Sequence, residues 1–375
     1  MVSKANDKHL ESFVEYFETG YRKATDKSVG FELEHLVLDK DLNPCKYFGD
    51  KGIEKVLYRL KPFYRNCQFD NNHLIGLDRS KVFISLEPGA QLEVSIGPCK
   101  NTIELEQHYN QFRAEIDPIL QSIGYKLINL GYQPKALAKD ITLIPKTRYR
   151  IFDKFFIGSR QNGRYMMRGT ASTQVTLDYI SEQDAIDKFR YLFALGPIWA
   201  WLFANTPVFE GKTNINPLLR SVIWQRADLR RAGIIANIFA KNYSFIDYAI
   251  LLDTLPLLVI ENGEANGLSA AEVYPNRKLV ISELEYIISN VFFDVRMKNF
   301  LELRTVDSLK ISQVTQLINS VTGVFYNLQK FAAVKELLGD LTADKVILAK
   351  KQIIQYGQKA LPYDKSFEDF QQILL

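Results

Sequence analysis

The chain has 375 residues, of which 47% are hydrophobic and 24% are charged, and its formal net charge is +4. A chain of this size buries about three quarters of the surface of its unfolded state, which predicts one large domain over residues 1–375, or two closely fused halves. The small net charge and dispersed basic residues exclude a nucleic-acid-binding footprint, and three cysteines are too few and odd in number for a disulfide framework.

The ends and the apolar runs predict a cytoplasmic protein with no membrane partner. The first eight residues are polar and lack the apolar core of a secretory signal. The most apolar run, 191–204, is short for a membrane span and is broken by Gly196 and Pro197, so a buried helix is the better interpretation.

The first predicted elements lead into an acidic strand. Residues 8–21 have the apolar spacing of an amphipathic helix that ends near Gly20. In 29–38 the alternation of a strand sends Phe31 to one face and Glu32 and Glu34 to the other. A second helix over 52–60 and a short strand over 71–77 follow.

The stretch 82–98 predicts a β-hairpin with one apolar face and one acidic face. Pro88 and Gly89 occupy the two middle positions expected of a type II turn. On the predicted arms, Glu87 and Glu93 share one parity and the aliphatic residues share the other. His35, on the apolar parity of the previous strand, is expected to be a packed core histidine.

A long helix over 101–123 and a strand over 125–133 are predicted next. The segment 134–150 has two prolines and little periodicity, so we expect a loop. Its residues Lys146, Arg148 and Tyr149 are candidates for binding an anion, and the alternative is that they are solvated polar side chains.

The middle of the chain predicts another polar strand and an arginine-rich stretch. In 170–179, Gln174 lies on the polar parity, and Ser181 then caps a helix that runs to about residue 205. The stretch 209–233 is rich in glycine, asparagine and arginine; its Arg220 and Arg231 suit a carboxylate or phosphate, and Trp224 suits a pocket wall.

The last acidic strand is expected over 299–306, with Glu302 and Arg304 on its polar face. Helices over 244 onward and 283–291 precede it, and the segment 308–375 is helical by periodicity. If the four polar-faced segments share an antiparallel sheet, their acids would repel one another unless cations lie among them, and Mg²⁺ is the obvious candidate.

Four motifs together resemble the plant and proteobacterial type of glutamate–cysteine ligase: G-F-E-L-E, S-L-E-P-G-A-Q-L-E, T-Q-V-T-L-D-Y and F-L-E-L-R-x-x-D. At longer range they are similar to glutamine synthetase. The resemblance spans about residues 8–307 in order and fades in the tail. It implies an α+β fold of the glutamine synthetase and guanido kinase type, in which helices flank a curved antiparallel sheet with an acidic concave face.

The resemblance also implies roles for individual residues. It implies two or three Mg²⁺ ions, with Mn²⁺ as an alternative, held by Glu32, Glu34, Glu87, Glu93 and Glu302, with Gln174 facing the same cluster. Arg304 would act with Glu302 in catalysis by stabilising the transferred phosphoryl group, and Asp307 completes the motif. Phosphate or substrate contacts would come from Lys146, Arg148, Tyr149, Arg168, Arg220, Trp224 and Arg231.

The expected reaction joins L-glutamate to L-cysteine at the expense of ATP, in a monomer or homodimer with small-molecule partners. The absence of G-x-x-x-x-G-K-[ST] and G-x-G-x-x-G argues against P-loop and Rossmann proteins. One departure is Gly169, which stands where the family often has arginine. Two alternatives remain: a related ligase with another amine or acid, and a binding protein that has lost turnover. Cys99 is expected to be a small buried hydrophobe, and His108 shows no metal-ligand spacing.

Overall fold

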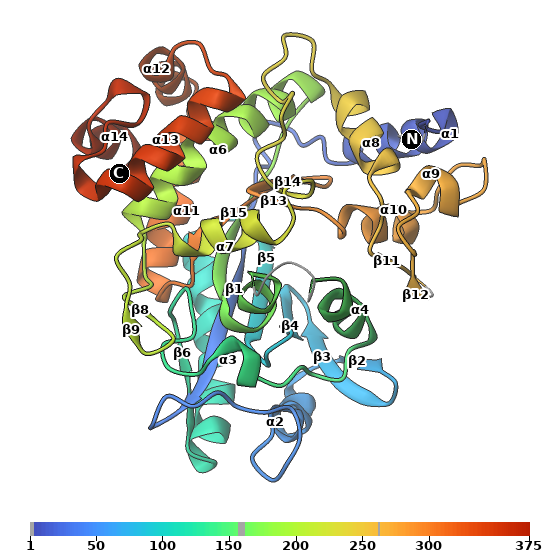
Figure 1. Cartoon of the computed structure of the whole chain (residues 1–375), viewed down its shortest axis with the longest axis vertical. Coiled ribbons are helices and arrows are strands. Elements are labelled where there is room, and N and C mark those ends of the chain that lie inside the picture. Colours follow the sequence, from blue (N-terminus) through green and yellow to red (C-terminus); the bar gives the residue numbers. More distant parts are fainter. Residues whose placement is uncertain (1–3, 157–161, 262) are drawn as a thin grey trace.

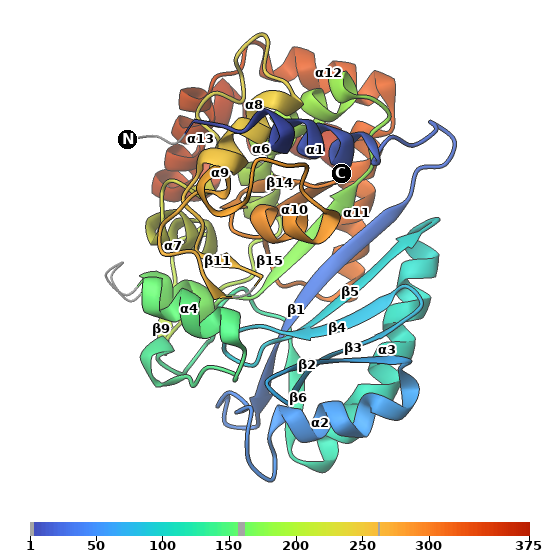
Figure 2. The same cartoon turned by 90° about the vertical axis from the view of Figure 1, so that its right-hand side faces the viewer.

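The largest element of the fold is an antiparallel sheet of nine strands (Figures 1 and 2). The computed structural model describes residues 4–156, 162–261 and 263–375. The strands lie in the order β14 (Val295–Met297), β15 (Leu301–Asp307), β7 (Ser172–Leu177), β1 (Val29–Asp39), β5 (Leu92–Cys99), β4 (Val82–Leu86), β3 (His73–Arg79) and β2 (Asn66–Asp70), and β6 (Tyr125–Ile128) pairs with the end of β1. The α+β fold with its large antiparallel sheet is confirmed.

Strand β1 is the centre of the sheet. Its first residues pair with β7 on one side and with β5 on the other, and its last four pair with β6. The predicted alternation is confirmed, because Phe31 and Leu33 are buried in the main hydrophobic cluster. His35 is fully buried on this face as expected, and its two ring nitrogens contact the Leu92 carbonyl at 3.1 Å and the Tyr109 hydroxyl at 3.0 Å.

The predicted hairpin is confirmed and consists of β4 and β5, but the prediction that its turn is of type II is wrong. The residue with positive φ is Ala90, at 64°, whereas a type II turn requires it at Gly89. The Glu87 carbonyl accepts the Ala90 N–H at 2.9 Å, and the Glu87 N–H donates to the Gln91 carbonyl at 2.9 Å. Glycine at position 89 instead allows the backbone of residue 168 to pass close to the turn, because a Cβ there would lie 2.7 Å from the carbonyl oxygen of residue 168.

Helices cover both faces of the sheet, and in Figure 2 α3 and α11 lie on one side and α4 and α7 on the other. The longer helices are α1 (Asp7–Glu18), α2 (Ile53–Leu60), α3 (Thr102–Ser122), α4 (Thr147–Phe156), α6 (Glu182–Leu202), α7 (Leu219–Ala227), α8 (Phe245–Thr254), α10 (Ile281–Ile288), α11 (Ile311–Phe325), α12 (Leu328–Leu338), α13 (Ala343–Tyr356) and α14 (Phe367–Leu374). Helices α3, α6 and α11 pack on β5, β15 and β7, respectively.

Most predicted helices are confirmed, and the local signals explain where they begin. Ser181 caps α6 by accepting the backbone N–H of Asp184, and Asn101 caps α3 by accepting that of Glu104. The tail is helical as predicted, and residues of α11 to α14 join the main hydrophobic cluster. Among the described helices, none has both the length and the hydropathy that crossing a bilayer requires.

Two predictions for connecting segments are wrong, and one strand was not predicted. The strand expected over 125–133 ends at Ile128, and β2 had no prediction. Helix α4 begins at Thr147, inside the segment 134–150 that was expected to be a loop. Four of its five aromatic or aliphatic residues are buried against neighbouring elements, so tertiary packing decides its structure where local periodicity gave no signal.

Candidate active site

Four carboxylates gather on one face of the sheet. Strand register places Glu34 of β1 opposite Glu93 of β5, and Glu32 of β1 opposite Gln174 of β7. Paired residues project from the same face, and Glu87 directly follows β4 at the hairpin turn. These five side chains line a cavity of about 290 Å³, which we call the acidic cavity. The prediction that separate strands bring their acids together is therefore met for these residues.

Burial and mutual repulsion raise the pKa values of three of these carboxyl groups. The pKa of Glu34 is raised to about 7, first by burial and then by the charge of Glu87. The pKa of Glu32 is raised by burial and by the charge of Glu302. Burial and three neighbouring glutamates raise the pKa of Glu93 well above its usual range. A cation among these groups would offset both the desolvation and the repulsion.

The donor set fits Mg²⁺. The lining carboxylates offer hard oxygen ligands, and neither cysteine nor histidine is among the described lining residues. Two carboxylates are also oriented by hydrogen bonds: Ser172 donates its N–H and hydroxyl to Glu34 at 2.9 and 2.7 Å, and the Ser85 hydroxyl donates to Glu93 at 2.8 Å. Such supporting contacts are typical of metal ligands.

Glu302 lies on the same face but in a cationic environment. Its fully buried carboxylate pairs with Arg296 at 2.7 Å, Lys298 at 3.1 Å and Arg304 at 2.5 Å. Burial acts to raise the pKa of Glu302, but the three cations outweigh it and hold the pKa below its usual range. We call these four residues the cationic end. Glu302 is absent from the described lining of the acidic cavity, so the structure does not place it with the other predicted metal ligands.

Arg304 joins the two groups. Its guanidinium donates to the side-chain oxygen of Gln174 and to Glu302, and it also lines the acidic cavity. The Gln174 amide donates in turn to Glu34 at 3.4 Å. Because Arg304 occupies the Gln174 oxygen, this residue positions the arginine here instead of offering a metal ligand.

The predicted anion-binding residues Lys146, Arg148 and Tyr149 line the cavity from the start of α4 and the residue before it. The Tyr149 hydroxyl donates to Glu87 at 3.1 Å, and the Lys146 ammonium lies 4.5 Å from the Tyr149 ring centre. Burial lowers the pKa of Lys146. Arg148 donates to the hydroxyl and carbonyl of Ser289 at 2.8 and 2.5 Å, which fixes its guanidinium at the rim.

Helix α7 supplies the wall opposite α4. Trp224 lines the cavity, and its indole N–H donates to the Thr170 hydroxyl at 3.3 Å. Arg220 lies behind it, with its guanidinium 5.2 Å from the indole centre and donating to the Arg304 carbonyl at 2.5 Å. Arg220 is therefore placed to support Arg304 and Trp224, and it is not among the described lining residues.

Three predicted residues are engaged elsewhere. Arg231 is fully buried and pairs with Asp228 at 2.9 Å, and Arg168 pairs with Asp153 at 2.5 Å. Neither lines the acidic cavity, so the structure does not support their predicted contact with substrate. Asp307 accepts hydrogen bonds from the loop after α6, at 2.8 and 2.7 Å, and holds that loop instead of orienting Arg304.

Gly169 has a packing reason for being glycine. A Cβ at this position would lie 2.3 Å from the ring of Tyr132, so no larger side chain fits without movement of that ring. The arginine that the family often carries here is thus excluded by the local packing of this chain.

Sequence reasoning missed Arg296, Ser289 and Phe292, which line the acidic cavity. A signal for Arg296 was present, because V-R-M-K alternates charged and apolar residues just before the last acidic strand. No signal was evident for Ser289 and Phe292, which reach the cavity through the packing of α10 and the segment that follows it.

A second cavity of about 630 Å³ opens on the same polar face and shares Glu32 and Phe83 with the first. Arg22, Arg79 and Lys81 contribute positive charge to its lining. The molecule therefore has two adjacent compartments that meet at an acidic residue of the central strand.

Comparison with known proteins agrees with this architecture. A model of the glutamate–cysteine ligase family 2 matches residues 28–342, which extends beyond the motifs and includes all of α12. The chloroplastic glutamate–cysteine ligase A of Oryza sativa subsp. japonica is 30% identical over 363 residues, covering 93% of this chain and 73% of that protein. The chloroplastic enzyme of Nicotiana tabacum is 29% identical, covering 93% and 69%.

A solved structure shares the fold. The glutamate–cysteine ligase of Francisella tularensis in complex with AMP superposes with a TM-score of 0.53 at 11% identity, covering 90% of this chain and 73% of that one. The family match covers most of the chain and includes every strand of the polar face from β1 to β15. The chain therefore belongs to glutamate–cysteine ligase family 2.

Proposed function

We propose that this protein is an ATP-dependent ligase that joins the γ-carboxyl group of L-glutamate to the amine of L-cysteine. The single observation that carries the proposal is the convergence of four carboxylates, of which Glu34 is buried, in one cavity that Arg304 closes at its cationic end. Relatives named as glutamate–cysteine ligases favour this pair of substrates over another acid and amine.

The reaction needs an activated carboxyl group. The glutamate γ-carboxylate attacks the γ-phosphorus of ATP, an O–P bond forms, the bond to the β-phosphate oxygen breaks, and ADP leaves. The cysteine amine then attacks the acyl carbon, the C–N bond forms, phosphate leaves, and the amine loses a proton to solvent. Two or three Mg²⁺ ions held by Glu32, Glu34, Glu87 and Glu93 would supply charge neutralisation for the polyphosphate.

The residues of the chain supply positioning and fixed positive charge. Arg304 is held in place by Gln174 and Glu302, so it can stabilise the transferred phosphoryl group without reorganising. Lys146 and Arg148 can bind a carboxylate from the α4 side, and Trp224 limits the size of what lies between them. Because Glu302 has three cationic partners, we propose that it orients Arg304 and Arg296, with metal binding left to the other four glutamates.

We assign the nucleotide to the second cavity. Its volume is the larger of the two, its lining carries Phe83 and Phe300 for a base and ribose, and Lys81 and Arg79 provide charge for phosphates. Glu32 borders both cavities, so the γ-phosphate would meet the acidic cavity there. The amino acids would then occupy the side covered by α4 and α7.

We further propose that residues 1–375 act as one ligase domain. The residues of α11 to α14 share a hydrophobic cluster with the strands of the sheet. The segment 308–375 would therefore support the sheet from its apolar side and take no part in the chemistry.

The test is a coupled ADP-release assay with purified protein, Mg²⁺ and ATP. ADP release should require both L-glutamate and L-cysteine, and mass analysis should show γ-glutamylcysteine as the product. A panel of other amines and acids should release little ADP. ADP release that is independent of L-cysteine, or a product with another amine, would overturn the assignment of substrates. Lack of stabilisation by Mg²⁺ and nucleotide would overturn the ligase itself.

A further inference from the structure

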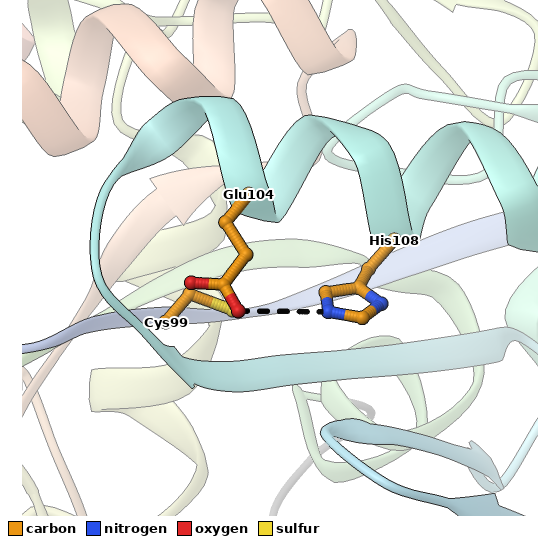
Figure 3. Close-up of side chains that lie close together, drawn as sticks. All are labelled: Cys99, Glu104 and His108. Carbon is orange, nitrogen blue, oxygen red and sulfur yellow. Dashed lines mark ion pairs between the residues drawn. The ribbon is translucent and has the colours of Figure 1, made fainter.

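Three side chains able to bind a metal converge where β5 meets α3, outside both cavities. Cys99 is the last residue of β5, and Glu104 and His108 lie one turn apart near the start of α3. One sulfur, one carboxylate oxygen and one imidazole nitrogen all lie within 4.8 Å of one another. Figure 3 shows Glu104 and His108 projecting from the same side of the helix towards the Cys99 sulfur. This proximity contradicts the expectation from sequence spacing that His108 has no partner ligands.

The cluster is held in place and open to solvent on one side. The Lys100 N–H donates to one Glu104 oxygen at 2.8 Å, so the carboxylate is oriented while its other oxygen faces the cluster. The side chains of Glu104 and His108 are 26% and 27% exposed, whereas Cys99 is buried beneath them. Within residues 4–156, 162–261 and 263–375, neither the Cys99 thiol nor the His108 ring makes a hydrogen bond. An ion can therefore enter from solvent and find two uncommitted ligands.

A cation already occupies part of this position. The Lys81 ammonium lies 2.5 Å from the Glu104 oxygen that faces the cluster, and His108 lies 3.9 Å from the same oxygen. The carboxylate thus already neutralises a positive charge at this point. A metal ion would take the place of the ammonium, and Lys81 also lines the second cavity with Gly97 and Pro98.

We propose that Cys99, Glu104 and His108 form a binding site for Zn²⁺ or a similar borderline transition metal. Zn²⁺ accepts sulfur, nitrogen and oxygen ligands in tetrahedral geometry, whereas Mg²⁺ does not bind thiolates. A solvent molecule completes the fourth position on the exposed side. Binding forms a bond between Zn²⁺ and the Cys99 sulfur, breaks the S–H bond, and releases one proton to solvent.

The site differs from the acidic cavity in the group that loses a proton when metal binds. Burial and the charge of Glu104 raise the pKa of the Cys99 thiol to about 11, while Lys81 acts in the opposite direction. The metal must displace that proton, so its affinity should rise with pH across the neutral range. Binding at the carboxylates of the acidic cavity releases no thiol proton and yields no metal–thiolate bond.

The test is titration of the full chain with Zn²⁺ and Co²⁺, with Mg²⁺ in excess and substrates absent because L-cysteine binds both metals. We expect one tightly bound Zn²⁺ per chain in competition with a chromophoric chelator. Co²⁺ should produce a thiolate-to-metal charge-transfer absorption. Cys99→Ser should abolish this absorption, and His108→Gln should weaken Zn²⁺ binding by at least about tenfold.

Matched controls separate this cluster from other thiols and imidazoles. Cys67→Ser on β2 and His73→Gln on β3 remove the same groups elsewhere and should leave the Zn²⁺ affinity unchanged. Lys81→Met removes the competing ammonium and should strengthen Zn²⁺ binding a few-fold. His108 is partly exposed, so His108→Gln keeps the test valid if Cys99→Ser does not fold.

Two results would overturn the proposal. One is a wild-type protein without the cobalt–thiolate absorption. The other is Zn²⁺ affinity that is insensitive to His108→Gln or reduced by Lys81→Met. The first result does not bear on the ligase reaction, because the three ligands lie outside both cavities. Lys81 lines the second cavity, so Lys81→Met is judged by Zn²⁺ affinity alone and not by activity.

Discussion

The acidic cavity and the cationic end share one face of one sheet, but their charge balance is opposite. Glu34 and Glu93 are raised in pKa by burial and by their acidic neighbours. Glu302 is the most deeply buried of the three, yet its pKa is lowered because Arg296, Lys298 and Arg304 surround it. Burial alone therefore does not decide the charge state of a glutamate on this sheet; the neighbouring strands do.

The difference means that charge changes sign from one end of this sheet face to the other. Negative charge accumulates on β1, β5 and the β4–β5 turn, and positive charge on β14 and β15, with Arg304 at the boundary. A bound polyphosphate needs cations on the first side, and a phosphoryl group in transfer meets a fixed guanidinium on the second. Substitutions of Arg304, Glu302 and Glu93, and a change of pH, each test whether the two ends of this face differ in this way.

Replacing the guanidinium of Arg304, which donates hydrogen bonds to both Gln174 and Glu302, should have the largest effect on activity. Arg304→Lys keeps the charge but cannot donate to Gln174 and Glu302 together, so we expect kcat to fall by about 10²–10³-fold with a small change in KM. Steady-state kinetics measure this, and Arg113→Lys, at an ion pair on α3, is the matched control. A change confined to KM would contradict a role in stabilising the transferred group.

Neutralising Glu302 should destabilise the protein. Glu302→Gln leaves three cations without their buried counter-charge, and we expect a loss of about 3 kcal/mol in the free energy of unfolding. Urea unfolding of the metal-free protein measures this loss. Glu336→Gln, at an exposed position on α12, should change stability by less than about 0.5 kcal/mol.

The same substitution in the acidic cavity should act in the opposite direction on stability. Glu93→Gln removes a charge that its neighbours repel, so the metal-free protein should melt at a higher temperature than wild type. Its affinity for Mg²⁺ and nucleotide should fall by about 10–100-fold. Thermal shift assays with and without Mg²⁺ measure both effects. A lower melting temperature without metal would show that the carboxylates do not repel one another.

The pH dependence of stability should be the smallest effect. Glu34 has a folded pKa of about 7, and an unfolded glutamate has a pKa of about 4.3. The folded state binds more protons between these values, so the metal-free protein should lose stability as pH rises from about 5 to about 8. Saturating Mg²⁺ should remove this slope, because the metal replaces the proton. Urea unfolding in EDTA and in Mg²⁺ tests it, and an unchanged slope would contradict metal binding here.

The polar face was predictable because its signal is local and periodic. Glu32, Glu93 and Arg304 each lie in a strand whose alternation fixes the side on which they project, and the family motifs then fix the order. The sequence could not separate Glu302 from the other glutamates, since its charge state depends on Arg296 of β14 and on Lys298 in the connection between β14 and β15.

Residues outside the sheet were predicted less well for a physical reason. Arg220 and Arg231 share one motif and one side-chain chemistry, but only packing places the first behind Trp224 and the second against Asp228. The start of α4 was likewise hidden, because its first turn contacts β2 residue Asp70 through Thr147 at 2.9 Å. Contacts between residues far apart in the chain produce no periodic pattern in the local sequence, so the sequence alone did not predict them.

Strand β1 contributes two of the four carboxylates. Backbone hydrogen bonds to three other strands hold it in place, so these two carboxylates project from a rigid part of the sheet. Lys146, Arg148 and Trp224 line the cavity from α4, the residue before it and α7, and these helices contact the sheet through side chains such as Thr147 and Arg220. A related protein can therefore change residues of α4 and α7 to accept a new amine and still keep the carboxylates that serve phosphoryl transfer. Sequence differences between relatives of different specificity should be concentrated in α4 and α7, and β1 should differ least.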